Sequence, residues 1–137
     1  MMVGAENPIS CRMPSYRDLK CWQHAKLLSI ECGKAAQRFP EEERLALAEQ
    51  LRRAAYSVPL NIAEGASRKG SKEFRRFLDT ARGSLSEVQT ALEIAREMEY
   101  LKEDEYHRLD AIATETAKTL WGLLRKISDS MKRSPVS

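Results

Sequence analysis

Residues 74–95 read FRRFLDTARGSLSEVQTALEIA and carry the most regular apolar pattern in the chain. Apolar residues recur there at alternating steps of four and three: Phe74, Leu78, Ala81, Leu85, Val88, Leu92 and Ala95. This spacing places them all on one face of an α-helix and is typical of helices that pack in bundles. We therefore predict a long amphipathic helix that begins at Ser71, a suitable N-cap.

A helix is also predicted before this segment, from the N-cap candidate Ser15 to Phe39. Pro40 is expected to end it, because proline cannot continue the helical hydrogen bonding. Its apolar residues again recur at three- and four-residue steps: Leu19, Trp22, Ala25, Leu28, Cys32, Ala35 and Phe39.

The second predicted helix begins with the acidic run at residues 41–43, since carboxylates favour the positive first turn of a helix. Gly65 is its expected C-terminal stop. Pro59 lies inside it, and we predict a kink there. Its apolar stripe is Leu45, Ala48, Leu51, Ala55, Val58 and Ile62.

The last predicted helix follows a short link at residues 100–104. Its stripe is Leu109, Ile112, Thr116, Leu120, Leu123 and Ile127. Four helices with short connections are expected to pack as antiparallel neighbours. The fold predicted for residues 15–127 is therefore an all-α, up-and-down antiparallel four-helix bundle. Flexible segments are expected on either side, an arm at residues 1–14 and a tail at residues 128–137.

Composition fits one domain with a modest charge. The chain has 137 residues, and its 23 Lys and Arg against 20 Asp and Glu give a net charge of +3. That charge is far below what a polybasic nucleic-acid binder carries, so any such signal must come from local clustering. Residues 1–14 lack the features of a signal peptide, and no apolar run is long enough to span a membrane. We expect a cytoplasmic protein with no membrane association.

Charge is unevenly distributed between the ends of the predicted bundle. Residues 65–82 and 116–133 each carry a net +4, and the topology brings both segments to one pole. Residues 39–49 and 98–115 carry −3 and −4 and share the other pole. Helix dipoles do not explain the cations in the first turns of the third helix, where positive charge is disfavoured. Candidate nucleic-acid-binding residues are therefore Arg68, Lys69, Lys72, Arg75, Arg76 and Arg82.

A polar stripe follows the second helix at steps of three and four, and it continues on the third. Its members are Arg53, Ser57, Asn61, Glu64 and Arg68, with Ser84 and Glu87 opposite. One interpretation is that these groups pair with each other and with carbonyls freed by Pro59. The other is that they line a binding groove. Gly83 and Ser84 are expected to allow close helix approach, and Glu87 to meet an arginine of the second helix.

The segment from Arg52 to Glu87 resembles a known family. It contains RRAAYSVPLNIAEG at residues 52–65, then Arg68, FRRFL at 74–78 and ARGS at 81–84, followed by Glu87. This order resembles the four-helix bundle family encoded within intervening sequences of bacterial 23S rRNA genes. The resemblance implies a ring-forming homo-oligomer, typically a pentamer, with no known catalytic activity. The family is also similar to the accessory variability determinant of diversity-generating retroelements, which engages nucleic acid and a reverse transcriptase; a reverse transcriptase partner follows only by that analogy.

Catalytic and metal sites have little support in the sequence. His24 and His107 lie on different helices, and Asp104 with His107 is only a lone echo of the Glu-x-x-His pairs of di-iron bundles. Cys11, Cys21 and Cys32 are spaced for neither zinc nor a disulfide framework, which indicates free thiols. Trp22 and Trp121 are predicted to be core or interface anchors, not stacking platforms. We expect no cofactor, no metal and no catalytic residues.

Two functions remain open from the sequence. The first is a non-enzymatic oligomer that binds RNA or DNA non-specifically through its basic pole. The second is a purely structural scaffold or protein–protein adaptor, in which the basic surface is only solvated.

Overall fold

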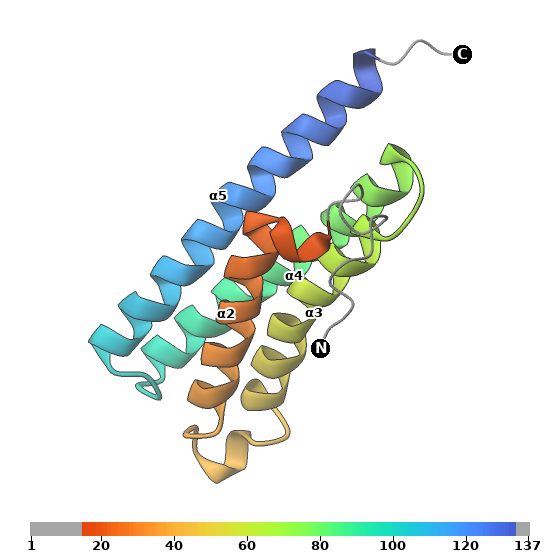
Figure 1. Cartoon of the computed structure of the whole chain (residues 1–137). Helices are drawn as coiled ribbons and strands as arrows, with labels where there is room; N and C mark the ends of the chain where they lie inside the picture. Colours follow the sequence, from red (N-terminus) through yellow and green to blue (C-terminus); the bar gives the residue numbers. More distant parts are fainter. Residues whose placement is uncertain (1–14, 134–137) are drawn as a thin grey trace, which may run out of the picture.

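The computed structural model describes residues 15–133, which form four α-helices and two short 3-10 turns (Figure 1). The helices are α2 (Lys20–Ala36), α3 (Leu47–Ala66), α4 (Ser71–Glu97) and α5 (Glu103–Arg133), and the turns are η2 (Tyr16–Asp18) and η3 (Glu41–Glu43). Each helix packs against the next along the chain, and α5 also packs against α2, which closes the bundle. The predicted all-α, up-and-down antiparallel bundle is confirmed. The arm predicted at residues 1–14 lies outside the described residues.

The apolar stripe of α4 forms one wall of the core, as its periodicity predicts. Six of its seven members, from Leu78 to Ala95, are buried, and Phe74 at its start is half-buried against them. Leu78 is fully buried, so its truncation to alanine would cost about 2–5 kcal/mol of stability. Local periodicity and tertiary packing therefore agree along this helix.

The second helix begins later than predicted. Glu41–Glu43 form the separate turn η3, and Ala46 has φ −122° and ψ −105°, which breaks the helix before Leu47. Because of this break Leu45 is turned away from the core and is 74% exposed, so its assignment to the apolar stripe is wrong. Glu43 still serves the helix terminus, since its carboxylate accepts a hydrogen bond from the Leu47 backbone N–H at 3.2 Å.

Pro59 lies within α3, and the helix is continuous around it from Leu47 to Ala66. The residues of its inner face, including Val58 and Ile62, are fully buried on both sides of the proline. A kink at Pro59 stays a prediction.

The link between α4 and α5 ends α4 with a tight turn. Glu99 adopts φ 65°, Tyr100 N–H bonds to the Ala95 carbonyl at 2.8 Å, and Glu99 N–H bonds to the Arg96 carbonyl at 2.9 Å. These two bonds close the carboxyl end of α4 in a Schellman motif, which directs the chain back along the bundle. A glutamate occupies the left-handed position, which glycine usually fills.

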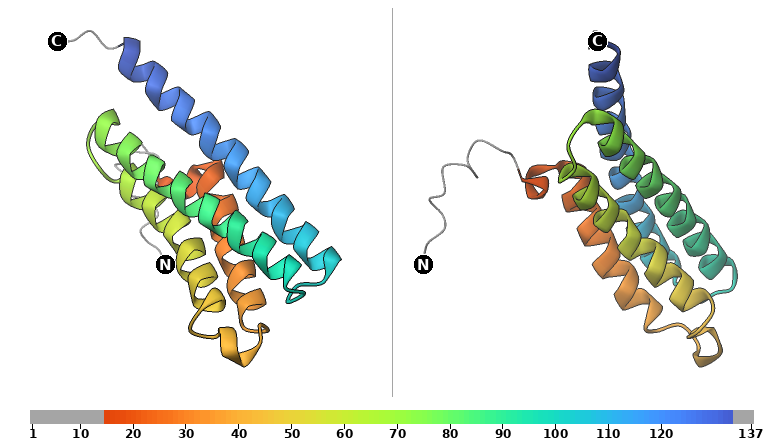
Figure 2. Two further views of the ribbon diagram at one scale, coloured as in Figure 1. Left: turned by 180° about the vertical axis from the view of Figure 1, so that it is seen from behind. Right: turned by 90° about the vertical axis from the view of Figure 1, so that its right-hand side faces the viewer.

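α5 is longer than its apolar pattern suggests. It continues to Arg133, past the predicted end at Ile127, while its last fully buried side chain is Leu124. Its final turns therefore extend beyond the core, as both views in Figure 2 show. Within residues 15–133, no helix combines the length and the apolar character needed to cross a membrane.

Candidate nucleic-acid interface

The predicted basic residues gather at one end of the bundle, together with cations of α5. The α3–α4 link, the first turns of α4 and the last turns of α5 lie at this end (Figure 1). We call this end the basic pole, and its cations are Arg68, Lys69, Lys72, Arg75, Arg76, Arg82, Arg125, Lys126 and Lys132. Across residues 65–82 and 125–132 these nine cations face three carboxylates, a net charge of +6. The structure therefore brings together cations from two segments that are far apart in the sequence.

Two arginines of the basic pole surround one aromatic ring. The guanidinium carbons of Arg68 and Arg76 lie 5.1 and 4.9 Å from the centroid of the Phe77 ring. Arg68 pairs with Glu64, and Arg76 donates to Glu73 at 2.9 Å. The hydrogen bond from Arg76 lowers the pKa of Glu73. This side of the pole is therefore largely neutralised by its own carboxylates.

Lys69 and Lys72 differ from these arginines, because both are exposed and neither forms an ion pair within the described part of the chain. Lys72 lies in the first turn of α4, where the helix dipole disfavours a cation. These two ammonium groups are therefore available to an external anion.

A second group of cations lines a groove between α4 and α5, with members on both helices. This α4–α5 groove has a volume of 290 Å³, and its lining residues are Arg75, Asp79, Arg82, Trp121, Leu124, Arg125, Ser128, Asp129 and Lys132. Arg75 joins the two helices by donating to the Ser128 hydroxyl at 2.5 Å. Asp79 lies 3.6 Å from Arg75 and 3.7 Å from Arg82, beyond ordinary hydrogen-bond distance. Both arginines therefore keep donors free.

The sequence predicts that Trp121 anchors the core or an interface. Its side chain is 53% exposed, so it is not a core anchor, and an interface role stays a prediction. Leu120 and Leu124 take the buried line of α5, and Trp121 lies one position away from Leu120, on the side that faces α4. Arg125 and Lys132 belong to the basic segment 116–133 but are not among the candidate binding residues predicted from the sequence. The sequence does not show that they lie across a groove from Arg75 and Arg82.

The polar stripe forms internal hydrogen bonds. The hydroxyls of Ser57 on α3 and Ser84 on α4 lie 2.7 Å apart, and the Asn61 amide donates to the Ser57 hydroxyl at 2.9 Å and to the Ser57 carbonyl at 2.8 Å. Arg53 lies 3.6 Å from Glu49 on its own helix. These contacts favour the interpretation that the groups of the stripe pair with each other, and the Ser57–Ser84 contact joins α3 to α4.

The expectation of close helix approach is wrong for Gly83, although Ser84 does meet α3 through Ser57, and the expectation for Glu87 is also wrong. A Cβ built on Gly83 would meet no atom within 4 Å, so this glycine faces open space and no helix approaches it. The close approach occurs at Gly65, where a Cβ would stand 2.8 Å from the Phe77 Cβ. Glu87 is exposed and forms no ion pair within residues 15–133.

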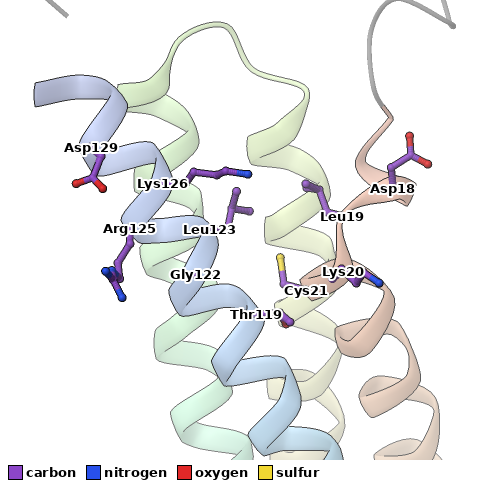
Figure 3. Close-up of a pocket in the computed structure, with 10 residues that line it drawn as sticks. All are labelled: Asp18, Leu19, Lys20, Cys21, Thr119, Gly122, Leu123, Arg125, Lys126 and Asp129. Atoms are coloured by element: carbon purple, nitrogen blue, oxygen red, sulfur yellow. The ribbon is translucent and has the colours of Figure 1, made fainter. Parts of the chain in front are cut away.

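A cavity of 640 Å³ lies between the start of α2 and α5 (Figure 3). Its walls carry charges of both signs, including Asp18, Lys126 and Asp129. Burial raises the pKa of the Cys21 thiol on its wall to about 11, so this thiol stays protonated and is a poor nucleophile. Neither histidine lines the cavity, although Thr119 on its wall lies 3.2 Å from His24.

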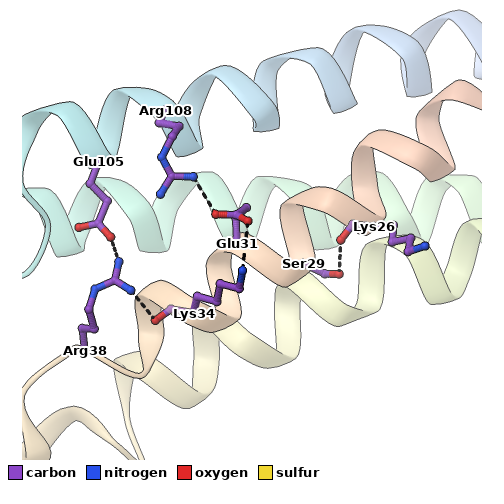
Figure 4. A network of polar contacts seen from close by, with 7 residues as sticks. All are labelled: Lys26, Ser29, Glu31, Lys34, Arg38, Glu105 and Arg108. Atoms are coloured by element: carbon purple, nitrogen blue, oxygen red, sulfur yellow. Dashed lines mark hydrogen bonds and ion pairs between the residues drawn. The ribbon is translucent and has the colours of Figure 1, made fainter.

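Towards the other pole, α2 and α5 are joined by a network of ion pairs (Figure 4). Arg108 donates to Glu31 at 2.7 Å, and Arg38 binds Glu105. The hydrogen bond from Arg108 lowers the pKa of Glu31. Because these contacts join α5 to α2 and to the turn directly after α2, the network stabilises packing rather than a ligand site.

The residues of the weak metal motif, Asp104 and His107, are exposed on α5. His107 lies 3.3 Å from Glu103 on the same exposed face of α5, and His24 lies 3.2 Å from the Thr119 hydroxyl. Within residues 15–133, no group of three or more His, Cys, Asp or Glu could hold a metal ion.

Comparison with known proteins agrees with this architecture. Residues 17–122 match the family described as 23S rRNA-intervening sequence protein. A crystal structure from Bacteroides thetaiotaomicron, of a protein with unknown function from the S23 ribosomal protein family, has a TM-score of 0.71 at 19% identity and covers 76% of this chain and 97% of its own. No curated protein matches the sequence. Because the family match covers α2, α3, α4, most of α5 and well over half of the chain, this protein belongs to the 23S rRNA-intervening sequence protein family.

Proposed function

We propose that this protein is a non-enzymatic, ring-forming homo-oligomer that binds nucleic acid non-specifically through its basic pole. The observation that carries the proposal is the net charge of +6 on that pole, with Lys69 and Lys72 exposed and free of ion pairs in the described residues. Lys and Arg that contact phosphates release counterions from nucleic acid, and this gives affinity without base recognition. A ring with parallel subunit axes would gather the basic poles on one face and focus their field.

Exposed apolar side chains support self-association. Leu27 and Ile30 on α2, with Tyr56 and Leu60 on α3, are 44–66% exposed. The Tyr56 hydroxyl lies 3.6 Å from the Cβ position of Gly33, so Tyr56 leans over α2. Because α2 and α3 run antiparallel, the turn before Gly33 on α2 lies beside the turn after Tyr56 on α3. Ile30 therefore lies level with Leu60. These side chains form one apolar strip, and such a strip is typical of a protein–protein contact.

The nature of the cavities supports a role without catalysis. The cavity between α2 and α5 holds a protonated thiol and no histidine, and the α4–α5 groove holds arginine, lysine and aspartate. The hydroxyl of Thr119, on the wall of the cavity, lies 3.2 Å from His24. It donates to the Glu115 carbonyl at 2.9 Å, so its proton is not held by the imidazole, as an activated nucleophile would require.

A charge-reversal experiment tests nucleic-acid binding. Lys69→Glu with Lys72→Glu changes two exposed residues and lowers the charge of the basic pole by four. We expect the wild-type protein to bind a fluorescent duplex at low salt, and the double variant to lose most of that affinity. The matched control is Arg44→Glu with Lys102→Glu, the same charge change at the acidic pole, and it should bind almost as the wild type does. Equal loss in both variants, or no wild-type binding at any salt, would contradict the proposal.

Light scattering tests the oligomer separately. We expect a mass of several subunits at micromolar concentration, and five by the family resemblance. Tyr56→Lys with Leu60→Lys should reduce that mass, since it places charge within the apolar strip. A strictly monomeric wild-type protein would contradict ring formation.

The alternative function is a scaffold or protein–protein adaptor without a nucleic-acid role, and the apolar strip on α2 and α3 favours it. A protein that forms the oligomer but binds neither duplex nor single strands would support this alternative. A reverse transcriptase as its protein partner would still rest on analogy alone.

A further inference from the structure

Trp121 is a large aromatic side chain that is exposed to solvent between two pockets. It lines the α4–α5 groove and also a neighbouring cavity of 200 Å³, whose other walls include Leu85, Ala117 and Leu120. Arg82 lines both pockets beside it. An indole that is 53% exposed at the junction of an apolar cavity and a charged groove is not required for core packing.

The charge of the groove fits a phosphate backbone. Its four cations exceed its two carboxylates, and the two closest ion pairs are 3.6 and 3.7 Å long. Arg125 and Lys132 form no ion pair within the described residues, and both lie on the same helix as Trp121. A phosphate can therefore bind Arg125 and Lys132 without displacing an ion pair, while Arg75 also donates to the Ser128 hydroxyl.

We infer that Trp121 is a base-stacking platform and that the α4–α5 groove binds single-stranded nucleic acid, with phosphates on Arg75, Arg125 and Lys132 and an unpaired base on the indole. This inference rests on the proposed binding of nucleic acid at the basic pole and deepens it by naming the strand form. Sites for single strands combine a positive groove with aromatic side chains on which bases stack. The cavity beside Trp121, whose lining also includes Ser86 and Gln89, would receive the edge of the stacked base.

The geometry favours a single strand over a duplex. Bases of a duplex are stacked on one another, so their faces cannot reach an indole without unpairing. A single strand offers a free base face every few ångströms, and this stacking is tolerant of sequence because every base has a π-face. The groove therefore adds strand selectivity to a pole that otherwise contacts only phosphate charge.

Tryptophan fluorescence tests the inference directly. The chain has two tryptophans, so Trp22→Phe leaves Trp121 as the only reporter. We expect oligothymidylate to quench the fluorescence of this variant, and a duplex of equal length to bind with much less quenching. In the protein with both tryptophans, Trp121→Leu should weaken oligothymidylate binding about 5- to 150-fold, the range for one stacked base, while duplex affinity stays the same. Trp121→Phe, which keeps an aromatic face, should retain most of the affinity.

The possible outcomes separate this inference from the proposed function. If both oligonucleotides bind but Trp121 is not quenched and Trp121→Leu has no effect, stacking is refuted and nucleic-acid binding stands. If neither oligonucleotide binds at low salt, the proposed function fails as well. If Trp121→Leu lowers the oligomer mass in light scattering, Trp121 is an interface contact, and the inference is overturned.

Discussion

Gly65 on α3 lies so close to Phe77 on α4 that a Cβ at residue 65 would stand 2.8 Å from the Phe77 Cβ. The same atom would lie 3.3 Å from the backbone carbonyl of Phe74, which cannot move without α4. Overpacking of this kind costs about 1–3 kcal/mol, and the higher helix propensity of alanine returns less than about 1 kcal/mol. Gly65→Ala should therefore lower the free energy of unfolding, as measured by urea denaturation.

Gly83→Ala is the matched control, because this glycine lies inside α4 with open space around it. Alanine there should raise the free energy of unfolding by about 0.5–1 kcal/mol, since glycine in a helix interior carries an entropic cost. Effects of the same sign at both glycines would show that the α3–α4 contact is not as close as described.

The hydroxyl pair between α3 and α4 should be energetically coupled. Ser57→Ala or Ser84→Ala leaves one hydroxyl without its partner at 2.7 Å, so each should cost about 1 kcal/mol. The double variant should cost less than the sum of the two, because it leaves neither hydroxyl behind. A double-mutant cycle by urea denaturation measures this coupling, and strict additivity would exclude a direct contact.

The ion pair between Glu31 and Arg108 predicts an acid-dependent loss of stability. The pKa of Glu31 lies below its ordinary value of 4.5, chiefly because Arg108 donates a hydrogen bond to it. The pair therefore stabilises the folded chain fully above that ordinary value, and the stabilisation is lost as pH falls through the lowered pKa. Glu31→Gln should destabilise the protein at pH 7 and reduce the further loss of stability between pH 5 and pH 3.

Glu93→Gln provides the comparison for this measurement, because Glu93 is exposed and forms no ion pair in the described chain. The free energy of unfolding of Glu93→Gln should depend on pH as that of the wild type does. If Glu31→Gln also follows the wild type, the pair with Arg108 contributes no pH-dependent stability.

The two described cysteines should be unreactive in the folded protein. Burial raises the pKa of Cys21 to about 11 and that of Cys32 to about 12, so almost no thiolate is present at pH 8. In a Cys11→Ser background, a thiol reagent should label neither cysteine quickly until urea unfolds the chain. Rapid labelling of the native protein would show that α2 opens on its own.

The sequence predicts the core better than it predicts the helix boundaries and the exposed faces. The stripe of α4 is confirmed because a period that alternates four and three fixes one buried face whatever the neighbouring helix is. The break at Ala46 could not be predicted, because residues 44–50 are good helix formers and carry no stop signal. The end of α5 was missed because its last turns lie beyond the core and carry no apolar period.

The candidate site was only partly predictable. The segment charges and the topology predict a basic pole, and the structure brings Arg75 and Arg82 together with α5 there. Trp121 could not be assigned from sequence, because one residue of rotation on a helix separates the buried Leu120 from the exposed indole. Likewise, no local pattern shows that Gly65 meets a neighbouring helix while Gly83 faces open space.

The salt dependence of nucleic-acid affinity tests the central claim most directly. If the basic pole binds phosphates, the logarithm of the association constant for a duplex should fall linearly with the logarithm of salt concentration, by about 0.9 for each phosphate contacted. Lys69→Ala with Lys72→Ala should make that slope shallower by about 2. A slope of zero, or a slope that the double variant leaves unchanged, would contradict binding through this pole.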